Sequence, residues 1–242
     1  VMEGNTVSDY DPEEVKRSVS IGASLAPVEW KEHKINFIDT PGYFDFVGEV
    51  RGALRVSDAA VIVVCAVSGV EVGTEKVWNY CDEREIPRAF FINKMDRENA
   101  NFNRTLESLR ESFGVSVAPV MLPIGSEADF SGVVDLVAMK AYSFSDNGRQ
   151  MVEQDIPANL SDKVEEYRTA LVEVVAETDD ELLMKYLEGE PLTDEEIVNG
   201  VRQNIANGQF VPVFCGSGVK KMGAQMLLDM VVSSCPSPAH AE

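Results

Sequence analysis

Short apolar runs alternate with predicted helices through the first part of the chain. The runs at 34–38, 59–66 and 88–92 have strand length, and 59–66 is apolar throughout, as in a strand covered on both faces. Between them, residues 46–56 and 73–84 are helical stretches. Strands that alternate with helices predict an α/β fold built on a doubly wound, mostly parallel sheet.

The middle of the chain, from residue 114 to residue 208, follows a different pattern. Residues 132–144 suggest strands, and Asp146-Asn147-Gly148 behind them is a hairpin-turn signal. Helices are then predicted at 161–176, 179–187 and 193–204. This order of strands followed by helices indicates an α+β unit.

Several helix ends carry capping residues. Ser161 is the predicted N-cap of the first of these helices, and Thr193 followed by Glu196 fits a capping box for the third. A last helix is predicted at 223–234 and ends before Pro236-Ser237-Pro238, whose prolines cannot continue it.

Two polar motifs stand at the ends of predicted strands. They are Asp39-Thr40-Pro41-Gly42 and Asn93-Lys94-Met95-Asp96. The Asp96 carboxylate can accept both N1–H and the exocyclic N2–H₂ of guanine, whereas adenine would leave it unpaired. Asp39 can reach Mg²⁺, usually through water, and the Gly42 amide can approach a γ-phosphate because no Cβ blocks it. Together the motifs indicate a guanine nucleotide site at the carboxyl ends of the strands.

The motif that should precede these two is missing. No GxxxxGK followed by Ser or Thr occurs, so the backbone amides, the Lys and the hydroxyl of a phosphate-binding loop are not provided. We expect a chain that starts after the first strand, the phosphate loop and the first helix of a nucleotide-binding domain. The alternative is a module that has lost nucleotide binding, but intact guanine-binding motifs would then have little use.

With these motifs the chain resembles the G domain of elongation factor G, the translocation GTPase of the bacterial ribosome, and most of all the elongation factor G-like paralogue group. The resemblance covers essentially the whole sequence. Its most specific segments are Ser20-Ile21, residues 39–46, Ser68-Gly69-Val70-Glu71, residues 93–96, Leu122-Pro123-Ile124-Gly125, Lys185-Tyr186-Leu187, residues 212–217 and Pro236-Ser237-Pro238.

The resemblance implies how the chain holds phosphate and metal. Ser20 takes the place of the switch I threonine that ligates Mg²⁺, and a serine hydroxyl can do the same. Asp39 to Gly42 begin switch II, so Asp39 is the second implied metal contact. The implied ligands are GTP, GDP and Mg²⁺, and the implied activity is GTP hydrolysis that drives translocation in protein synthesis.

The resemblance also implies the guanine contacts. Asn93, Lys94 and Asp96 form the guanine site, and Ser217 resembles the last G motif, whose backbone N–H meets guanine O6. Gly218 stands where the family usually has Ala.

One departure from the family pattern affects the chemistry. The family has a histidine after the glycine of switch II, which orients the attacking water; here Tyr43 follows Gly42 at the implied catalytic position. A tyrosine hydroxyl in water has a pKa of about 10, so it is a neutral and weak base at pH 7. Phosphoryl transfer depends on positioning and charge stabilisation, so we expect slower hydrolysis or a different positioning residue. The alternative is that Tyr43 substitutes adequately.

Charge and cysteine content narrow the function classes. Direct nucleic-acid binding usually shows a basic stripe, and the net charge here is −20, so no sequence-specific nucleic acid is expected. Four cysteines without CxxC spacing favour reduced thiols in a cytoplasmic protein. Two histidines argue against a histidine metal site and a Ser-His dyad. Because no apolar stretch reaches the about 18 residues of a membrane helix, no membrane partner is expected.

The acidic middle segment is interpreted as an insertion. Residues 114–208 hold 19 acidic and 6 basic side chains and separate the Asn93 motif from Ser217, which lie close together in Ras-like GTPases. The family has such an insertion, called G′. We therefore divide the chain into a G domain, residues 1–113 and 209–242, and an inserted α+β subdomain, residues 114–208.

The insertion also suggests partners. By resemblance it touches the ribosomal stalk protein, and its carboxylates are either an electrostatic dock for a basic protein or a solvated helix face. The expected partners are the large-subunit GTPase centre of the ribosome and its stalk protein, for a monomeric protein.

The sequence thus predicts part of a ribosome-associated translational GTPase, with this chain inactive by itself because the phosphate loop is missing. A ribosome-protection or release-type factor shares the domain, but the insertion and its entry at Leu122-Pro123-Ile124-Gly125 favour elongation factor G. A GTP-dependent ribosome-binding module with slow or no hydrolysis is the alternative from another class, supported by Tyr43. The segment ahead of Ser20 is expected to be mobile.

Overall fold

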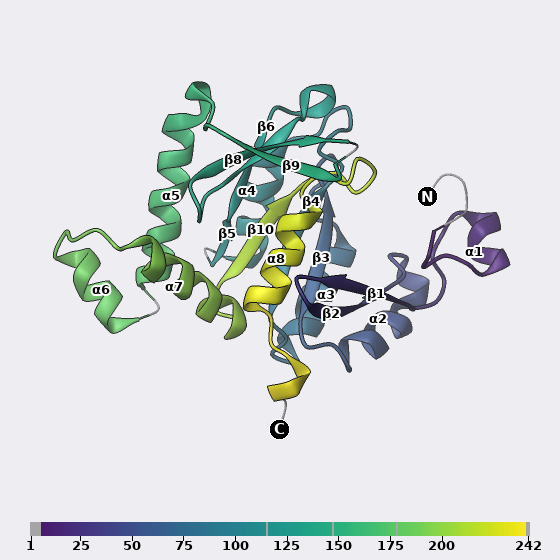
Figure 1. Cartoon of the computed structure of the whole chain (residues 1–242). Helices are drawn as coiled ribbons and strands as arrows, with labels where there is room; N and C mark the ends of the chain where they lie inside the picture. Colours follow the sequence, from purple (N-terminus) through teal and green to yellow (C-terminus); the bar gives the residue numbers. More distant parts are fainter. Residues whose placement is uncertain (1–5, 115, 147, 178, 241–242) are drawn as a thin grey trace.

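The core of the protein is a parallel sheet with strand order β3-β4-β10-β5 (Figure 1). The computed structural model describes residues 6–114, 116–146, 148–177 and 179–240. All three pairings in this sheet are parallel, so the doubly wound α/β fold expected from the sequence is confirmed. The strands are β3 (Ala60–Cys65), β4 (Arg88–Asn93), β10 (Val211–Cys215) and β5 (Val117–Pro119).

Helices cover both faces of the parallel sheet. Trp78 of α3 (Val72–Asp82) and Phe113 of α4 (Phe102–Phe113) stack with Phe90 of β4 at centroid distances of 5.6 and 5.4 Å. On the other face α8 (Ala224–Ser234) lies in front of β10 (Figure 1). Phe90 is therefore fully buried, as expected for a central strand. Beside α3 packs α2 (Val47–Leu54), preceded by a turn of 3₁₀-helix at Phe44–Phe46.

The middle segment forms an antiparallel sheet of its own, in the order β6-β7-β8-β9. One continuous buried cluster joins this sheet and its helices to the parallel sheet. The middle segment therefore shares a hydrophobic core with the rest of the fold. Its elements are β6 (Met121–Ile124), β7 (Gly132–Asp135), β8 (Lys140–Ser145), β9 (Gln150–Gln154), α5 (Ser161–Ala176), α6 (Asp180–Leu187) and α7 (Asp194–Ala206).

Some expectations about the insertion change. β5, inside the range 114–208 assigned to the insertion, pairs with β10 in the parallel sheet, because its apolar side chains are buried there. Ser161 is not a cap: Leu160 is the N-cap residue of α5 and makes no side-chain capping bond. The capping box of Thr193 and Glu196 is present. Of the predicted hairpin turn, Asn147 lies outside the described residues.

The first strands form a small separate sheet, so the prediction that the run 34–38 belongs to the parallel sheet is wrong. β1 (Ser24–Trp30) and β2 (His33–Asp39) pair antiparallel over their whole length. The tip of this hairpin is fastened to α8, because Trp30 Nε1 and Lys31 Nζ both lie 2.7 Å from Asp229 Oδ1. Among the described residues, β2 and β3 each pair on one side only. Val63 in the middle of β3 is 60 % exposed, so this strand has an open edge and an uncovered apolar side chain.

The segment ahead of Ser20 contains a short helix, α1 (Pro12–Arg17), with a capping box formed by Asp11 and Glu14. Glu14 Oε1 also accepts the amides of Ile21 and Gly22 at 2.9 and 3.0 Å. Within residues 6–19 the structure shows a capped helix, and the carboxylate of Glu14 joins it to residues 21–22; the mobility of this segment stays a prediction. Within the described ranges no helix combines the length and the apolarity needed to cross a membrane.

Candidate functional site

The candidate guanine site lies where two neighbouring parallel strands end. Asn93 is the last residue of β4, and β10 beside it continues into Gly216 and Ser217. Asn93 Oδ1 accepts the amide of Lys94 at 2.7 Å and the amide of Gly218, 125 positions further on, at 2.9 Å. One side chain therefore joins the two loops that the sequence assigns to the base.

Backbone hydrogen bonds hold the same two loops together. The Gly216 amide donates to the carbonyl oxygen of Ile92 at 2.9 Å, and the Met95 amide donates to the carbonyl oxygen of Gly216 at 3.1 Å. A Cβ at Gly216 would lie 2.2 Å from the carbonyl oxygen of Met222, so the loop needs glycine at this position. The geometry of the loop pair is thus fixed before any ligand binds.

Ser217 shapes the second loop from inside. It is fully buried, its amide donates to the carbonyl oxygen of Met222 at 3.0 Å, and its Oγ accepts the amide of Lys220 at 3.1 Å. The amide that the resemblance assigns to guanine O6 is therefore already engaged with Met222, and the amide of the next residue, Gly218, is held by Asn93. When a base binds, each of these two amides would have to give up its present acceptor, or share its hydrogen between that acceptor and guanine O6.

Asp96 is the acid in this pair of loops that is available to a ligand. It follows Met95, which is completely buried and anchors the turn. Asp96 itself is half-buried, and among the described residues its carboxylate makes no hydrogen bond or ion pair. An uncommitted carboxylate beside two rigid loops can accept a pair of N–H donors, as the Watson–Crick edge of guanine offers.

The residues assigned to phosphate and metal lie ahead of β1 and at the end of β2. Asp39 ends β2, and Asp39, Gly42 and Tyr43 are exposed. The Oγ of Ser20 donates to Asp9 Oδ1 at 2.7 Å. In the part of the chain that the structure describes, no hydrogen bond or ion pair joins any two of these four candidates.

Their chemistry still suits Mg²⁺, which prefers oxygen ligands and is usually bound through one or two protein groups plus phosphate oxygens. The hydroxyl of Ser20 and the carboxylate of Asp39 are such ligands. Within the described residues no group of three or more His, Cys, Asp or Glu side chains is arranged to hold a metal. The residue types fit the ion, and the assignment of Ser20 and Asp39 stays a prediction.

A cation–π contact fastens the chain next to Tyr43. Lys76 Nζ of α3 lies 3.4 Å from the ring centroid of Phe44, which is 59 % exposed. Tyr43 is 60 % exposed, and its hydroxyl makes no hydrogen bond within the described residues. The contact holds the neighbour of Tyr43 and leaves the tyrosine ring itself free to move.

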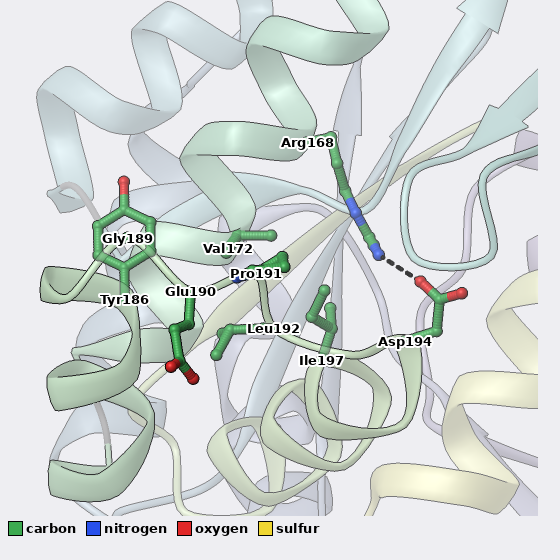
Figure 2. A pocket seen from close by; sticks show the side chains of 9 residues that line it. All are labelled: Arg168, Val172, Tyr186, Gly189, Glu190, Pro191, Leu192, Asp194 and Ile197. Atoms are coloured by element: carbon green, nitrogen blue, oxygen red, sulfur yellow. Dashed lines mark hydrogen bonds and ion pairs between the residues drawn. The ribbon is translucent and has the colours of Figure 1, made fainter.

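A separate hollow of about 370 Å³ lies in the insertion, between α5, α6 and α7 (Figure 2). Arg168 and Asp194 are on one side of it, and Glu190 is at its rim beside Tyr186 (Figure 2). A shallow apolar hollow with carboxylates at its edge suits an apolar side chain from a basic partner. Its apolar lining consists of Val172, Pro191, Leu192 and Ile197.

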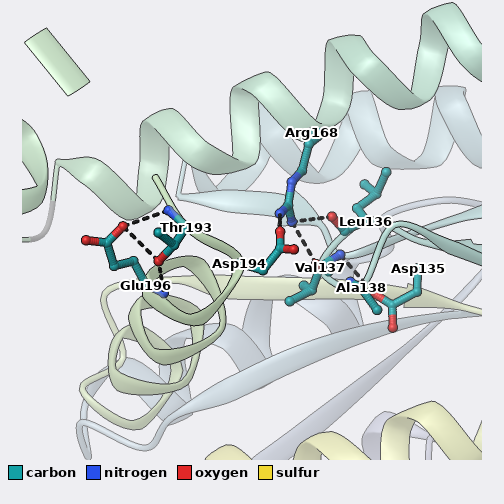
Figure 3. Close-up of polar contacts among 8 residues, drawn as sticks. All are labelled: Asp135, Leu136, Val137, Ala138, Arg168, Thr193, Asp194 and Glu196. Carbon is teal, nitrogen blue, oxygen red and sulfur yellow. Dashed lines mark hydrogen bonds and ion pairs between the residues drawn. The ribbon is translucent and has the colours of Figure 1, made fainter. Parts of the chain in front are cut away.

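Arg168, on one side of this hollow, makes several hydrogen bonds (Figure 3). Its Nη1 donates to the carbonyl oxygens of Leu136 and Val137 at 2.5 and 2.9 Å, and its Nη2 donates to Asp194 at 3.2 Å. Asp135, in the same loop, accepts two backbone amides at 2.8 and 2.9 Å. Burial lowers the pKa of Arg168 and raises the pKa of Asp135. The guanidinium thus ties the loop between β7 and β8 to α5 and α7.

Comparison with known proteins agrees with the fold. The family model of the elongation factor Tu GTP binding domain matches residues 1–237, so the chain belongs to this family of translational GTPase domains. It is similar to a crystal structure of a protein from Thermus thermophilus, with 34 % identity and a TM-score of 0.91. That match covers 98 % of this chain and 36 % of the other, so this chain spans about a third of the length of that relative.

Sequence reasoning missed several residues that build the site. It named Asn93 as a base contact and not as the bridge to Gly218, and it passed over Glu14 and Lys76. The spacing of Asp11 and Glu14 is a capping-box pattern and could have predicted α1. No local pattern places Lys76 over a ring in another element.

Proposed function

We propose that this protein is the nucleotide-binding part of a ribosome-associated translational GTPase resembling elongation factor G, which binds and hydrolyses GTP to drive translocation. The observation that carries the proposal is the bridge at Asn93, whose Oδ1 accepts the amides of Lys94 and Gly218 at 2.7 and 2.9 Å. It supports a base pocket made from the two motifs that the family uses for guanine.

In this proposal the chain's own residues divide the work. Asp96 accepts the two N–H donors of guanine, Lys94 lies against the base, and the loop at Ser217 and Gly218 faces O6. Asn93 keeps these loops in register. The specificity for guanine follows because an adenine would leave the Asp96 carboxylate without its two donors.

At the phosphate end, Asp39 and Ser20 are the residues that would hold Mg²⁺, which would neutralise charge on the β- and γ-phosphates. Ser20 would first give up its hydrogen bond to Asp9. The amide of Gly42 would meet the γ-phosphate. Because the 242 residues contain no phosphate-loop motif, we expect the chain by itself to bind nucleotide weakly and to hydrolyse it poorly.

Tyr43 favours a second candidate, a GTP-dependent ribosome-binding module with slow or no hydrolysis. Its hydroxyl is exposed and uncommitted, and a tyrosine cannot become a cation beside the γ-phosphate as a histidine can. If Tyr43→His in the full-length protein raises ribosome-stimulated turnover, the slow-hydrolysis proposal is supported. If turnover of the full-length protein stays the same, Tyr43 substitutes adequately and the second candidate is rejected.

The acidic insertion is the proposed contact with the ribosomal stalk protein, in a cytoplasmic and monomeric protein. Support comes from the net charge of −13 on residues 114–208 and from the apolar hollow between α5, α6 and α7 with its acidic rim. A dock of this kind weakens as salt screens it, with a Debye length of about 10 Å at 0.1 M. Association that ignores ionic strength would count against it.

The test of the guanine site is competition binding with GDP, ADP and xanthosine diphosphate. Guanine should be preferred, and Asp96→Asn should shift the preference toward xanthine by roughly 1,000-fold, because an amide offers one acceptor and one donor. Asp129→Asn, in an exposed 3₁₀ turn of the insertion, is the matched control and should change nothing. Equal binding of guanine and adenine would contradict the proposal. No binding up to millimolar nucleotide would place the phosphate cradle outside these residues.

A further inference from the structure

The tip of the β8–β9 hairpin meets the loop that follows Ser217. Gly148 is buried, although it lies at the end of a hairpin whose neighbouring residues Asp146 and Arg149 are exposed. What covers it is backbone: a Cβ at Gly148 would lie 2.2 Å from the carbonyl oxygen of Lys220 and 2.7 Å from that of Lys221. In Figure 1 the end of this hairpin lies beside the yellow loop between β10 and α8.

A side-chain hydrogen bond secures the same contact. Gln225, in the first turn of α8, donates from Nε2 to the carbonyl oxygen of Gly148 at 2.5 Å. The Oε1 atom of Gln225 is buried and has no partner among the described residues. The glutamine is therefore held at the contact by the hairpin alone.

The loop that the hairpin covers is the one that carries Ser217 and Gly218. Ser217 Oγ accepts the amide of Lys220 at 3.1 Å, so a shift of Lys220 acts directly on Ser217. Lys221 has a φ of 57°, a strained left-handed conformation for a non-glycine residue that the surrounding contacts must hold in place. Asn93 fastens one side of this loop, and the hairpin fastens the other.

We propose that the β8–β9 hairpin of the insertion is a positioning element for the guanine-recognition loop, acting through Gly148 on Lys220 and through Gln225. The inference rests on the proposed guanine site for its functional meaning. It makes the insertion part of the frame of the base pocket, so that displacement of the hairpin loosens the grip on the base.

The test compares two glycines that have nearly the same φ. Gly148 has φ +78° and Gly189, at the end of α6, has φ +79°, but a Cβ at Gly189 meets nothing within 4 Å. Gly148→Ala and Gly189→Ala therefore carry the same backbone strain, and the first alone pushes against Lys220. Gln225→Leu removes the hydrogen bond without a backbone clash and is a second variant.

The first readout is hydrogen exchange of residues 217–222 in the chain without nucleotide. Gly148→Ala should raise exchange there by about 10-fold, Gln225→Leu should raise it less, and Gly189→Ala should leave it unchanged. Unchanged exchange at 217–222 in Gly148→Ala, with faster exchange in the hairpin itself, would overturn the proposal, since the loop would then stand without the hairpin.

The second readout is the dissociation rate of GDP, which should rise by about 10-fold in Gly148→Ala and stay at the wild-type value in Gly189→Ala. Loosened exchange with an unchanged dissociation rate would also overturn the positioning role. If the wild-type protein binds guanine and adenine nucleotides equally, the proposed function fails; if it binds neither, the phosphate cradle lies outside these residues. In both cases the exchange experiment still decides whether the hairpin holds the loop.

Discussion

The guanine end and the phosphate end of the candidate site are built in opposite ways. At the guanine end, Asn93 and Ser217 follow adjacent parallel strands and are joined by side-chain and backbone hydrogen bonds. At the phosphate end, Ser20 precedes a separate two-stranded sheet and Asp39 is the last residue of that sheet, and no hydrogen bond joins the two among the described residues. The two loops at the guanine end are therefore held together by hydrogen bonds, whereas no hydrogen bond joins Ser20 to Asp39 in the described part of the chain.

The difference follows from the neighbours that each strand has. β4 lies between two strands and under helices, so its end is held from all sides. β2 and β3 each have one free edge in the described part of the chain. Rigid placement of functional residues depends on such packing, and a strand end without neighbours can reposition when a ligand or another segment arrives.

The largest expected effect is a difference in thiol alkylation rate between Cys65, at the end of β3, and Cys215, at the end of β10. Burial disfavours the thiolate of Cys65, but hydrogen bonds from Ser68 and Val67 and the charge of Lys94 outweigh it and lower the pKa of Cys65. Burial raises the pKa of Cys215. Iodoacetamide at pH 8 should therefore modify Cys65 roughly 100-fold faster than Cys215, as measured by peptide mass spectrometry.

The other two thiols serve as controls for this labelling. Burial raises the pKa of both to about 11, so they should react as slowly as Cys215; they are Cys81 and Cys235. Equal labelling of Cys65 and Cys215 would mean that the two strand ends are equally open and would break the comparison.

The next largest effect is on the free energy of unfolding, and it compares two adjacent valines of β3, one buried and one exposed. Val64 is 2 % exposed and Val63 is 60 % exposed. Val64→Ala should lower the free energy of unfolding by about 2 kcal/mol through lost burial and a cavity. Val63→Ala should stay within about 0.5 kcal/mol. Urea denaturation measures both, and a cost at Val63 close to that at Val64 would show that something covers β3 in solution.

A smaller loss of stability is expected when the side chain of Asn93, which bridges the two guanine-motif loops, is removed. Asn93→Ala removes the acceptor for the amides of Lys94 and Gly218 and should cost about 1.5 kcal/mol, since both amides can turn to water. Asn79→Ala, an exposed position of α3 whose side chain makes no hydrogen bond within the described ranges, is the control. Equal stability of the two variants would show that the guanine loops do not depend on this bridge.

The sequence predicted the elements whose pattern is local. Residues 161–176 match α5, and the Thr193–Glu196 capping box is present. Both were predictable because helical periodicity and capping depend on residues that are close in the sequence. The motifs at Asp39 and Asn93 fall at strand ends as expected. The fold class was predictable for the same reason, from the alternation of apolar runs and helices.

Contacts between distant segments were beyond the sequence. Nothing near β5 indicates that three residues pair with a strand more than ninety positions away in the parallel sheet. The turn signal at Gly148 explains its φ but gives no hint that Lys220 lies against it. Such pairings depend on how residues 114–208 pack on the parallel sheet, and no local pattern in a single sequence predicts that packing.

The smallest global effect is expected at the phosphate end, and it tests whether the loop around Ser20 is an independent unit. Glu14 accepts the amides of Gly22, Ile21 and Asp11, and these hydrogen bonds lower its pKa. A carboxyl whose pKa is depressed in the folded state stabilises that state above its ordinary pKa of 4.5, and the contribution is lost as pH falls through the depressed value.

Glu14→Ala should therefore raise hydrogen exchange at 21–22 while the unfolding midpoint of the whole chain stays close to wild type. Glu13→Ala, on the same helix with an exposed ion pair to Arg17, should leave exchange at 21–22 unchanged. Wild-type protection at these amides, corrected for intrinsic rates, should fall as the pH drops below 4.5. If Glu14→Ala instead unfolds the parallel sheet, the phosphate end is coupled to the core as firmly as the guanine end, and the contrast between the two ends does not hold.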